Sequence, residues 1–485
     1  MKQRSIRIVL TMLLVTMFLV SASPIPAFTQ GEVSVSESLL VAPANNSAGS
    51  TLYLPIVAKN YPLVTLFGVE MDIYAPNLGL EQMTQSGASY FRYNGLIWSA
   101  VEPTKGARNW DAVSNLEGQL KGAGNVRGET ILIIRSTPEW AQKVNGYTCG
   151  PVKQDEFGAF ANFLRDAVAR YSAPPFNVKY FELWNEPDID PSLNVPDSVY
   201  GCWGEKDDTY YGGRYYGEML KAVYPSIKAA NPDSQVLLGG LLLDCNPDLA
   251  GSCNDKRPAM FLEGILRANA GPFFDGVSFH GYDYYQGSLG KFANANWKSG
   301  WNNGGPVVAH KASFIRSKLA AFNVTGKYLI NTEAAVIFDG GCDEICQETK
   351  AFYMGQVYAA AIASELRANV WYSVTGWRNS GLINGSNMEL MPAYNAYKLA
   401  RSRLLASVFT REVSDYSQVK VYEFNRGDRR VWVLWSLDEA THVVELPGAP
   451  LAAWTWNTAT KDYVAAAPSV SLEVGLAPIY LEWAP

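Results

Sequence analysis

From residue 64 onward, short apolar runs alternate with amphipathic stretches along the chain. The apolar runs predict strands, and stretches such as 155–171, 211–230 and 349–368 predict the helices between them. This alternation is typical of βαβ units and a parallel sheet, and eight such strands predict a closed (β/α)8 TIM barrel. The expected strands are 64–72, 90–96, 130–134, the run 179–186, 235–242, 276–279, 327–330 and 369–374.

The pattern changes after a last predicted barrel helix at 393–405. The run 419–424 alternates between apolar and polar residues, a turn follows at 425–428, and a second strand covers 431–435. Short strands with turns between them predict an antiparallel β-sandwich. We therefore divide the chain into a catalytic barrel at 63–407 and a small β-sandwich domain at 408–485, and we expect the latter to contribute no catalytic group.

The N-terminus has the pattern of a secretion signal. Lys2, Arg4 and Arg7 precede an apolar run at 8–20, and small residues and prolines follow up to residue 27. A retained membrane anchor is the alternative, but the run is short for a span of ~20 residues. We predict a signal peptide at 1–27, a linker at 28–62 and no integral membrane segment after signal removal. The protein is then secreted or extracellular, either free or associated with the cell surface. A strand-like run at 52–57 inside the linker is either an extra strand or part of a tail.

Six cysteines fit an exported protein, because disulfides persist outside the cytoplasm and no Cys-x-x-Cys zinc spacing is present. All six lie in loops beyond predicted strand ends at the same rim of the barrel. We expect the local pairs Cys245–Cys253 and Cys342–Cys346, and the pair Cys149–Cys202 between the loops after the third and fourth strands.

Composition narrows the class of partner. The chain is 48% hydrophobic and 18% charged, which indicates a globular protein. Its net charge of −6, without a basic tract beyond the first residues, argues against nucleic acid. The 14 Trp and 27 Tyr suit the apolar faces of sugar rings, although most will pack in the core. We expect no metal and no cofactor, since acidic pairs such as Asp343-Glu344 lack EF-hand spacing. Nothing in the sequence indicates an oligomeric state.

Two glutamates carry the candidate chemistry. Pro187 cannot donate to a sheet ladder, so the fourth strand must stop there and leave Glu186 at its C-terminal tip, where barrel enzymes hold their catalytic groups. Glu333 ends the seventh predicted strand, and the two tips face each other across the barrel mouth. Glycosidic hydrolysis needs such a pair of carboxyl groups, and a separation of ~5–5.5 Å gives retention. A surface glutamate in a turn, and a solvated or helix-capping acid, are the alternatives.

The string Trp184-Asn185-Glu186-Pro187 resembles the acid/base signature of clan A glycoside hydrolases. The resemblance covers about residues 64–405 and is nearest to glycoside hydrolase family 39, with family 5 as a near alternative. It implies a retaining β-glycoside hydrolase that acts on an oligo- or polysaccharide. In that reading Glu186 is the acid/base and Glu333 the nucleophile. Asn185 then binds the substrate 2-hydroxyl, and Arg92 is the charge partner of the nucleophile.

The resemblance implies further contacts around this pair. His280 and Tyr282 on the sixth strand resemble contacts to substrate and nucleophile, and Trp377 after the eighth strand resembles the aromatic floor under the sugar. Trp98 and Trp140, after the second and third strands, are added as candidate sugar contacts.

Structural alternatives exist for these side chains: a salt bridge for Arg92, a core histidine for His280, and packing for Trp377. A transglycosylase with the same residues and a non-catalytic glycan-binding barrel are the competing functions. We expect the long loops 149–155, 188–208 and 339–347 to set the choice of substrate.

Overall fold

The structure, a computed structural model, describes residues 64–71, 78–249, 258–284, 301, 306–338, 341–438, 440–460, 464–466 and 469–485. The predicted signal peptide at 1–27 and linker at 28–62, with its run at 52–57, lie outside these residues. Within the described part of the chain, no helix combines the length and apolar character that crossing a membrane requires.

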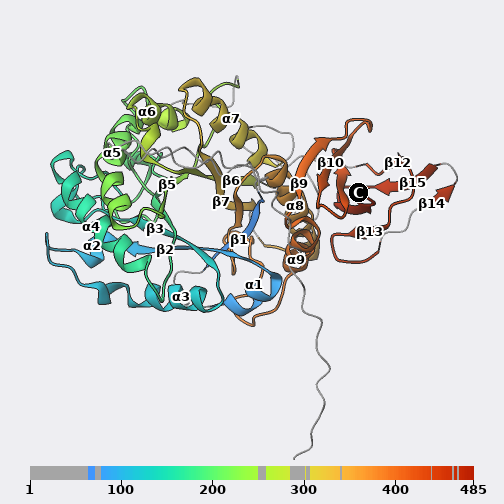
Figure 1. The fold of residues 1–485 in the computed structure, drawn as a ribbon, viewed down its shortest axis with the longest axis horizontal. Coiled ribbons are helices and arrows are strands. Elements are labelled where there is room, and N and C mark those ends of the chain that lie inside the picture. Colours follow the sequence, from blue (N-terminus) through green and yellow to red (C-terminus); the bar gives the residue numbers. More distant parts are fainter. Residues whose placement is uncertain are drawn as a thin grey trace, which may run out of the picture. The chain divides into compact units, whose positions relative to one another are not determined.

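Eight parallel strands form a ring in chain order, and pairing of β1 with β8 closes it (Figure 1). The predicted (β/α)8 barrel is therefore confirmed. Its strands are β1 (Leu66–Glu70), β2 (Tyr90–Ile97), β3 (Glu129–Arg135), β4 (Tyr180–Asn185), β5 (Gln235–Leu241), β6 (Gly276–Tyr284), β7 (Tyr328–Ile337) and β8 (Ala368–Trp371).

Two strands are longer than the apolar runs predicted. β6 and β7 stay paired as far as Tyr284 and Ile337, past an irregularity between Phe279 and His280. Glu333 therefore lies inside β7 and not at its end. The physical reason is that the polar side chains in this part of β7 find partners inside the barrel, so an apolar run underestimates the strand.

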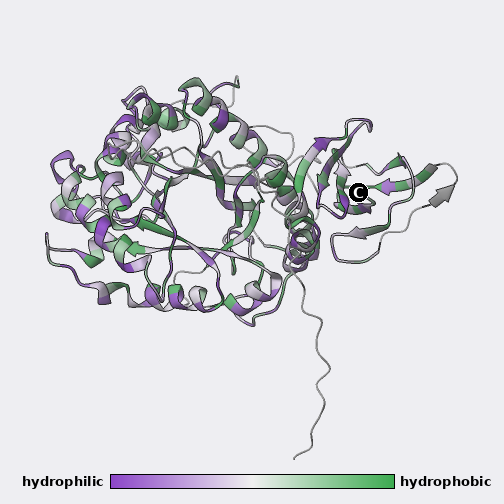
Figure 2. Cartoon of the chain, in the orientation of Figure 1, coloured by the Kyte–Doolittle hydropathy of each residue, from purple (hydrophilic) through white to green (hydrophobic). Residues whose placement is uncertain are grey.

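Helices surround the strand ring (Figure 1), and both hydrophilic and hydrophobic residues occur along them (Figure 2). They are α1 (Leu80–Ser86), α2 (Trp98–Val101), α3 (Ser114–Asn125), α4 (Phe157–Tyr171), α5 (Gly213–Ala230), α6 (Phe261–Arg267), α7 (Val307–Ala321), α8 (Glu344–Ala363) and α9 (Pro392–Leu404). Short 3-10 turns occur at η1 (Trp110–Val113), η2 (Glu139–Ala141), η3 (Gln154–Glu156), η4 (Pro191–Leu193), η5 (Pro258–Met260) and η6 (Gly271–Phe273).

The helix predicted at 349–368 is wrong at both ends. It begins at Glu344, because the Asp343 side chain caps it by accepting a hydrogen bond from the Cys346 backbone N–H at 2.9 Å. It ends at Ala363, and Glu365 then adopts a left-handed φ of 50° that stops the helix. The remaining residues turn into β8.

The barrel interior changes from apolar to polar along its axis. One layer consists of apolar and tyrosine side chains, namely Tyr90, Ile131, Tyr180, Leu237, Ile330, Ala368 and Val370. Two residues further along, the inward positions of β2, β4 and β6 carry Arg92, Glu182 and Ser278, all fully buried. Buried polar groups need partners, so this second layer requires a closed hydrogen-bond network at the C-terminal ends of the strands.

The C-terminal strands form two antiparallel sheets, ordered β13-β16-β11-β10-β9 and β12-β15-β14, which confirms the predicted sandwich. The strands are β9 (Val408–Glu412), β10 (Val419–Asn425), β11 (Arg430–Ser436), β12 (His442–Leu446), β13 (Ala452–Thr455), β14 (Val464–Ala466), β15 (Ser469–Val474) and β16 (Ile479–Trp483). β11 is apolar on both faces. Trp432 and Leu434 enter the core between the sheets, whereas Val431, Val433 and Trp435 join the barrel core.

Helix α8 is the element that both cores share. On one side its Tyr358 stacks on Phe67 of β1, with ring centroids 4.2 Å apart. On the other side, the Gln356 amide donates to the Leu476 carbonyl at 3.0 Å. A Cβ added to Gly355 would lie 2.6 Å from the Tyr480 hydroxyl, so this position requires glycine. The β-sandwich is therefore packed against the barrel and not tethered loosely to it.

Replacing Gly355 by leucine should destabilise the protein, because the new side chain meets the sandwich. Overpacking of this kind costs about 1–3 kcal/mol of the free energy of unfolding. Gly118→Leu in α3 is the matched control, since nothing lies within 4 Å of its Cβ position. There a better helix former should be neutral or stabilise by up to about 1 kcal/mol. Urea denaturation of both variants tests this, and equal stability of Gly355→Leu and wild type would contradict the shared interface.

Candidate active site

One buried guanidinium, that of Arg92, organises the C-terminal end of the barrel. Its Nε lies 2.7 Å from Glu182 Oε2, and its Nη1 contacts Glu333 Oε1 at 2.5 Å and also Glu70 Oε2. Its Nη2 donates to Asn185 Oδ1 at 2.7 Å. Burial opposes the charge of Arg92, but the surrounding carboxylates raise its pKa well above the usual value. Arg92 is therefore a fixed cation that ties β1, β2, β4 and β7 together.

Backbone geometry aims Glu186 into the barrel mouth. Trp184 and Glu186 have left-handed φ values of 78° and 46°, which non-glycine residues rarely adopt. The Glu186 N–H donates to the Gly240 carbonyl at 3.0 Å, and the Trp184 indole donates to the Cys149 carbonyl at 2.9 Å. Strained residues held by such contacts concentrate at functional sites. Pro187 follows directly, and β4 ends as predicted.

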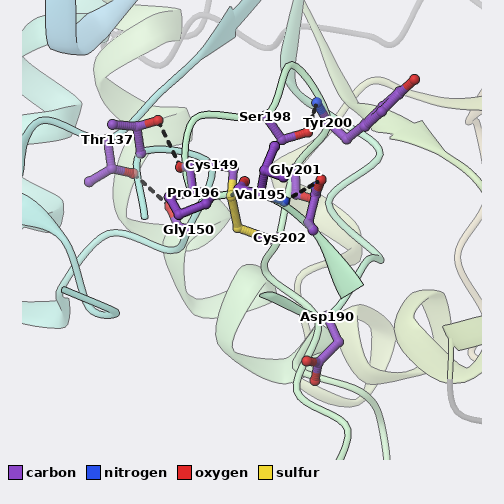
Figure 3. The surroundings of a disulfide bond; sticks show 12 residues. Thr137, Cys149, Gly150, Asp190, Val195, Pro196, Ser198, Tyr200, Gly201 and Cys202 are labelled. Carbon is purple, nitrogen blue, oxygen red and sulfur yellow. Dashed lines mark hydrogen bonds between the residues drawn. A yellow bond between two sulfur atoms is a disulfide. The ribbon is translucent and has the colours of Figure 1, made fainter. Parts of the chain in front are cut away.

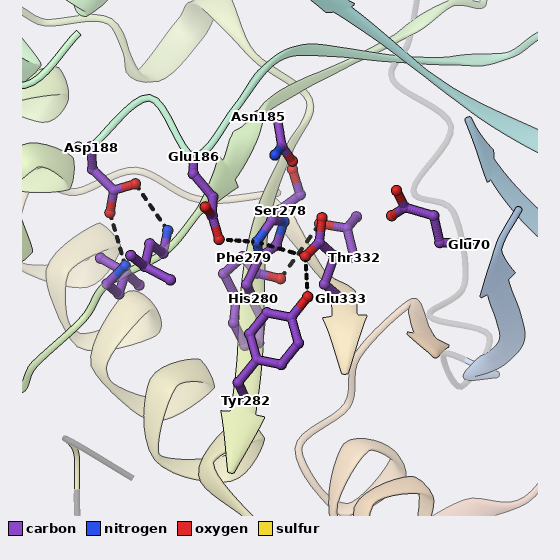
Figure 4. Close-up of polar contacts among 12 residues, drawn as sticks. Glu70, Asn185, Glu186, Asp188, Ser278, Phe279, His280, Tyr282, Thr332 and Glu333 are labelled. Atoms are coloured by element: carbon purple, nitrogen blue, oxygen red, sulfur yellow. Dashed lines mark hydrogen bonds and ion pairs between the residues drawn. The ribbon is translucent and has the colours of Figure 1, made fainter. Parts of the chain in front are cut away.

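His280 connects the two glutamates (Figure 4). Its Nδ1 lies 2.8 Å from Glu186 Oε1 and 3.3 Å from Glu333 Oε2, and its Nε2 lies 3.4 Å from Arg92 Nη2. A guanidinium can only donate, so Nε2 accepts and Nδ1 carries the proton. Burial and the charge of Arg92 lower the pKa of His280 well below its usual value, which keeps the ring neutral. The ring is a hydrogen-bond donor toward both carboxyl groups.

Glu182 of β4 holds Arg92 in place and is itself held by hydroxyl groups of β6 and β7. It is fully buried, and its Oε1 accepts hydrogen bonds from the Ser278 hydroxyl at 2.9 Å and the Thr332 hydroxyl at 3.3 Å. A Cβ at Gly240 would lie 2.1 Å from His280 Nε2 and 2.8 Å from Glu182 Oε1. Only glycine fits there without displacing both groups.

Glu186 and Glu333 lie together in different environments. One carboxyl oxygen of each, together with a ring nitrogen of His280, lie within 4.8 Å of one another. Burial and the neighbouring charge of Glu333 raise the pKa of Glu186 well above the usual range. Burial also raises the pKa of Glu333, but Arg92 and a hydrogen bond from the Tyr282 hydroxyl oppose the rise. The pair can therefore hold one carboxylic acid and one carboxylate at the same pH.

These three side chains are also close enough together to meet the geometric requirement for a metal ion. The proton on His280 Nδ1, however, leaves no nitrogen lone pair directed at the two carboxyl groups. Their oxygens already accept hydrogen bonds from His280, Arg92 and Tyr282. The donor set therefore fits acid–base chemistry better than metal binding.

A pocket of about 330 Å³ opens above the pair, a size typical of small-ligand sites. Acidic, amide and aromatic side chains dominate its lining, which consists of Glu70, Asn94, Asn185, Glu186, Ile189, Asn194, Val199, Tyr200, Leu242, Tyr282, Glu333, Tyr372 and Trp377. Trp377 is 43% exposed, so its ring is not simply a packing residue. A second pocket, of about 370 Å³ and lined by residues between Leu266 and Lys327, contains no carboxylate in its lining. Chemistry and not size therefore identifies the candidate site.

The loop between β4 and α5 forms one wall of the pocket and is held by a disulfide (Figure 3). Cys202 is bonded to Cys149 in the loop after β3, with a Cα–Cα distance of 5.3 Å. Next to it, the Gly201 N–H donates to the Asn185 carbonyl at 2.5 Å. These contacts hold the neighbouring Val199 and Tyr200 at the pocket. The predicted pair Cys149–Cys202 is confirmed, as is Cys342–Cys346, while Cys253 of the third predicted pair lies outside the described residues.

The structure brings most of the predicted site residues together, namely Arg92, Asn185, Glu186, His280, Tyr282, Glu333 and Trp377. It does not bring Trp98 and Trp140 to the pocket. Trp98 is fully buried, with its indole bonded to Glu102 Oε2 at 3.0 Å and its ring 4.7 Å from that of Phe160. Trp140 packs on Trp98 with ring centroids 5.4 Å apart. Trp98 covers the face of α4, Trp140 donates its indole N–H to the Glu102 carbonyl at 3.1 Å, and neither ring lines the pocket.

Other residues of the site were not predicted. Glu70 and Glu182 sit within apolar strand sequences, although Glu70, like Glu186, lies at the C-terminal end of a strand, and that position was the available signal. Tyr200 and Tyr372 reach the pocket from a loop and from the segment after β8. Their placement depends on backbone paths for which the sequence carries no comparable signal.

No known protein-family profile matches the chain, and no curated protein sequence matches it. Solved structures with the same fold include a family 39 glycoside hydrolase from Bacteroides cellulosilyticus WH2, with a TM-score of 0.63, 18% identity, and coverage of 87% of this chain and 80% of that one. A family 30 endoxylanase from Clostridium papyrosolvens C71 has a TM-score of 0.58, 13% identity, and coverage of 87% and 97%. A monomeric β-xylosidase from Caulobacter crescentus CB15 has a TM-score of 0.54, 15% identity, and coverage of 87% and 96%. At these identities the likeness shows the fold, and the structural neighbours agree with the resemblance to family 39.

The buried carboxyl of Glu70 should make stability depend on pH. Burial, and the charges of Glu333 and Glu182, raise its pKa to about 8, against the effect of Arg92. Because the pKa of Glu70 is higher in the folded state, its contribution to the free energy of unfolding is complete below the unfolded-state pKa. That contribution is lost as the pH rises to about 8. The stability of wild type relative to Glu70→Gln should therefore fall between pH 5 and pH 8, by at most about 1.4 kcal/mol per pH unit. Urea denaturation across this range tests it, and a constant or rising difference would contradict the buried acid.

Proposed function

We propose that the protein is an exported, retaining β-glycoside hydrolase that cleaves O-glycosidic bonds of an oligo- or polysaccharide by double displacement. The observation that supports it most is the pair Glu186 and Glu333, with carboxyl oxygens within 4.8 Å of each other in opposed electrostatic settings. His280 Nδ1 lies 2.8 Å from one carboxyl group and 3.3 Å from the other. Two carboxyl groups that share such a contact are close enough for one of them to attack the sugar directly, as in retaining enzymes.

In the first step, Glu186 donates its proton to the leaving oxygen and Glu333 attacks the anomeric carbon. The C–O bond to the leaving group breaks, and an ester bond forms between Glu333 and the sugar. Arg92 and Tyr282 hold Glu333 in place through its two oxygens. Burial favours the protonated form of Glu186 before the bond breaks.

The electrostatics then reverse the role of Glu186. The charge of Glu333 contributes to the raised pKa of Glu186. Once Glu333 is esterified, that charge is gone and the pKa of Glu186 falls. Glu186, which lost its proton in the first step, can remain ionised and take a proton from the incoming water. Water then attacks the anomeric carbon from the opposite side, the ester breaks, and the configuration is retained.

Two pocket residues fit a sugar between these carboxyl groups. Asn185 accepts the Arg92 N–H with its Oδ1, which leaves its NH₂ group for a hydroxyl such as the 2-hydroxyl. Trp377 presents an exposed ring, which packs edge-on against Tyr282 with centroids 6.2 Å apart, to an apolar sugar face. Because two of the structural neighbours are a β-xylosidase and an endoxylanase, β-xylosides are the first substrates to test.

Azide rescue separates the two glutamates. Glu186→Ala should hydrolyse aryl glycosides with poor leaving groups slowly but still form the intermediate from activated ones. Without a general base the intermediate accumulates, and added azide should give the β-glycosyl azide by two inversions. Glu333→Ala cannot form the ester, so azide should attack once and give the α-azide. NMR of the products distinguishes the anomers.

The opposite products from the two variants would reverse the assignment. If NMR of the newly released sugar, before mutarotation, shows an inverted anomeric configuration for the wild type, the retaining mechanism is wrong. Failure of the wild type to release sugar from a panel of aryl glycosides and polysaccharides would overturn the hydrolase itself and favour glycan binding.

Tyr282→Phe should change the pH profile in a defined direction. The Tyr282 hydroxyl lowers the pKa of Glu333, so its removal should shift the acid limb of kcat/KM to higher pH. At the optimum, loss of a hydrogen bond to a charged group should reduce kcat/KM by about 10- to 100-fold. Tyr416→Phe, which removes a hydroxyl bonded to a carbonyl in the β-sandwich, is the control. An unshifted acid limb in Tyr282→Phe would mean that Glu333 is not the group that titrates there.

A further inference from the structure

Glu70 is a third carboxyl group of the pocket, and the proposed reaction does not use it. It ends β1, where it pairs in register with Arg92, and it lines the pocket together with Glu186 and Glu333. Figure 4 shows its carboxyl on the side of Glu333 that faces away from Glu186. Arg92 Nη1 contacts both Glu70 and Glu333, so the two carboxyl groups are neighbours. Glu70 thus lies beside the nucleophile and not beside the acid.

We propose that Glu70 determines specificity by binding a hydroxyl of the sugar that Glu333 attacks, and that the pocket accepts an uncharged sugar there. This inference rests on the proposed function and adds the substrate class to it. Glu333 attacks the glycone, whereas Glu186 protonates the bond to the leaving group. A group next to Glu333 and opposite Glu186 therefore contacts the glycone.

A purely structural role for Glu70 leaves one of its oxygens unexplained. Its Oε2 contacts Arg92, but Arg92 already has two contacts with Glu182, at 2.7 and 3.3 Å, and one with Asn185. Within the described ranges, Glu70 Oε1 has no hydrogen-bond partner, and the side chain keeps 6% of its surface exposed in a pocket wall. This oxygen is open to the pocket and not sealed in the protein interior, so a sugar hydroxyl that enters the pocket can bind it.

The charges around Glu70 define which sugar it can accept. Arg92, Glu333 and Glu182 face it from β2, β7 and β4, and Tyr372 lies beyond β8. One cation opposite three carboxyl groups favours a neutral Glu70, which can donate a hydrogen bond to a hydroxyl oxygen as well as accept one. A uronic acid would bring a further carboxylate into this group. No lysine or arginine is among the described residues that line the pocket, and Arg92 is fully buried beneath it.

The inference can be tested on the full chain by combining substitutions of Glu70 with substrates that lack single hydroxyl groups. The parent is the aryl glycoside that the wild type hydrolyses best, compared with its 3-, 4- and, where present, 6-deoxy analogues. In the wild type, removal of one of these hydroxyls should lower kcat/KM by about 10- to 100-fold. In Glu70→Ala, the loss of kcat/KM caused by removing that one hydroxyl should disappear. The losses caused by removing the other hydroxyls should stay as in wild type. Glu70→Gln, which can still hydrogen-bond, should keep much of the penalty.

The control is Glu129→Ala, a change at the opposite end of the barrel where the carboxylate accepts a hydrogen bond from the Tyr90 hydroxyl. It should leave every deoxy penalty as in wild type. The aryl uronide of the same configuration should be hydrolysed at least about 100-fold more slowly than the neutral parent, because its carboxylate would lose hydration beside other carboxyl groups.

The outcomes are distinct. Unchanged deoxy penalties in Glu70→Ala, with all rates lowered evenly, would show that Glu70 only positions Arg92 and would overturn the inference alone. Equal hydrolysis of uronide and parent would overturn the restriction to uncharged sugars. No hydrolysis by the wild type of any glycoside would overturn the proposed function and this inference with it.

Discussion

The structure depends on the balance of charge around Arg92. A guanidinium with no solvent exposure is tolerated inside a barrel only if carboxylates and hydrogen bonds replace the water that it has lost. Glu182, Glu70 and Glu333 supply those contacts from three strands, and Asn185 completes them. The barrel must therefore close in one register for the charges to meet. Removing one partner would leave an uncompensated buried charge, which is far more costly than losing a surface ion pair.

The same cluster makes two similar side chains behave differently. Glu333 lies against Arg92 and Tyr282, which stabilise its charge. Glu186 accepts a hydrogen bond from His280 Nδ1–H, and the negative charge of Glu333 raises its pKa. The two environments are coupled, so neutralising one glutamate changes the proton affinity of the other. A reaction that alternately consumes and restores the charge of Glu333 fits that coupling. Glycine at position 240 is the steric condition for it, because any larger residue would displace His280.

The rest of the chain holds this centre in a defined shape. The β4–α5 loop is fastened by the Cys149–Cys202 disulfide and by the contact of Gly201 with the Asn185 carbonyl, so the pocket wall is tied to the strand that presents Glu186. On the other side, α8 is buried between the barrel and the β-sandwich. The sandwich covers the face of α8 that points away from the strands, a face that on a surface helix would be polar and meet solvent. None of the sandwich residues that the structure describes lines the pocket.

The sequence by itself predicted the order of strands and helices, the end of β4 at Pro187 and the approach of Glu186 to Glu333, because periodicity and proline chemistry are local properties. It placed Glu333 at the end of its strand, whereas β7 continues to Ile337. Only the tertiary structure decided that Glu70 and Glu182 belong to the site, since an acid inside an apolar strand reveals its partners only when the ring closes. The tertiary structure also excluded Trp98 as a sugar contact, because its ring is buried in packing against α4. Aromatic residues near strand ends look alike in sequence, and the surface that each one covers depends on how the neighbouring helix packs.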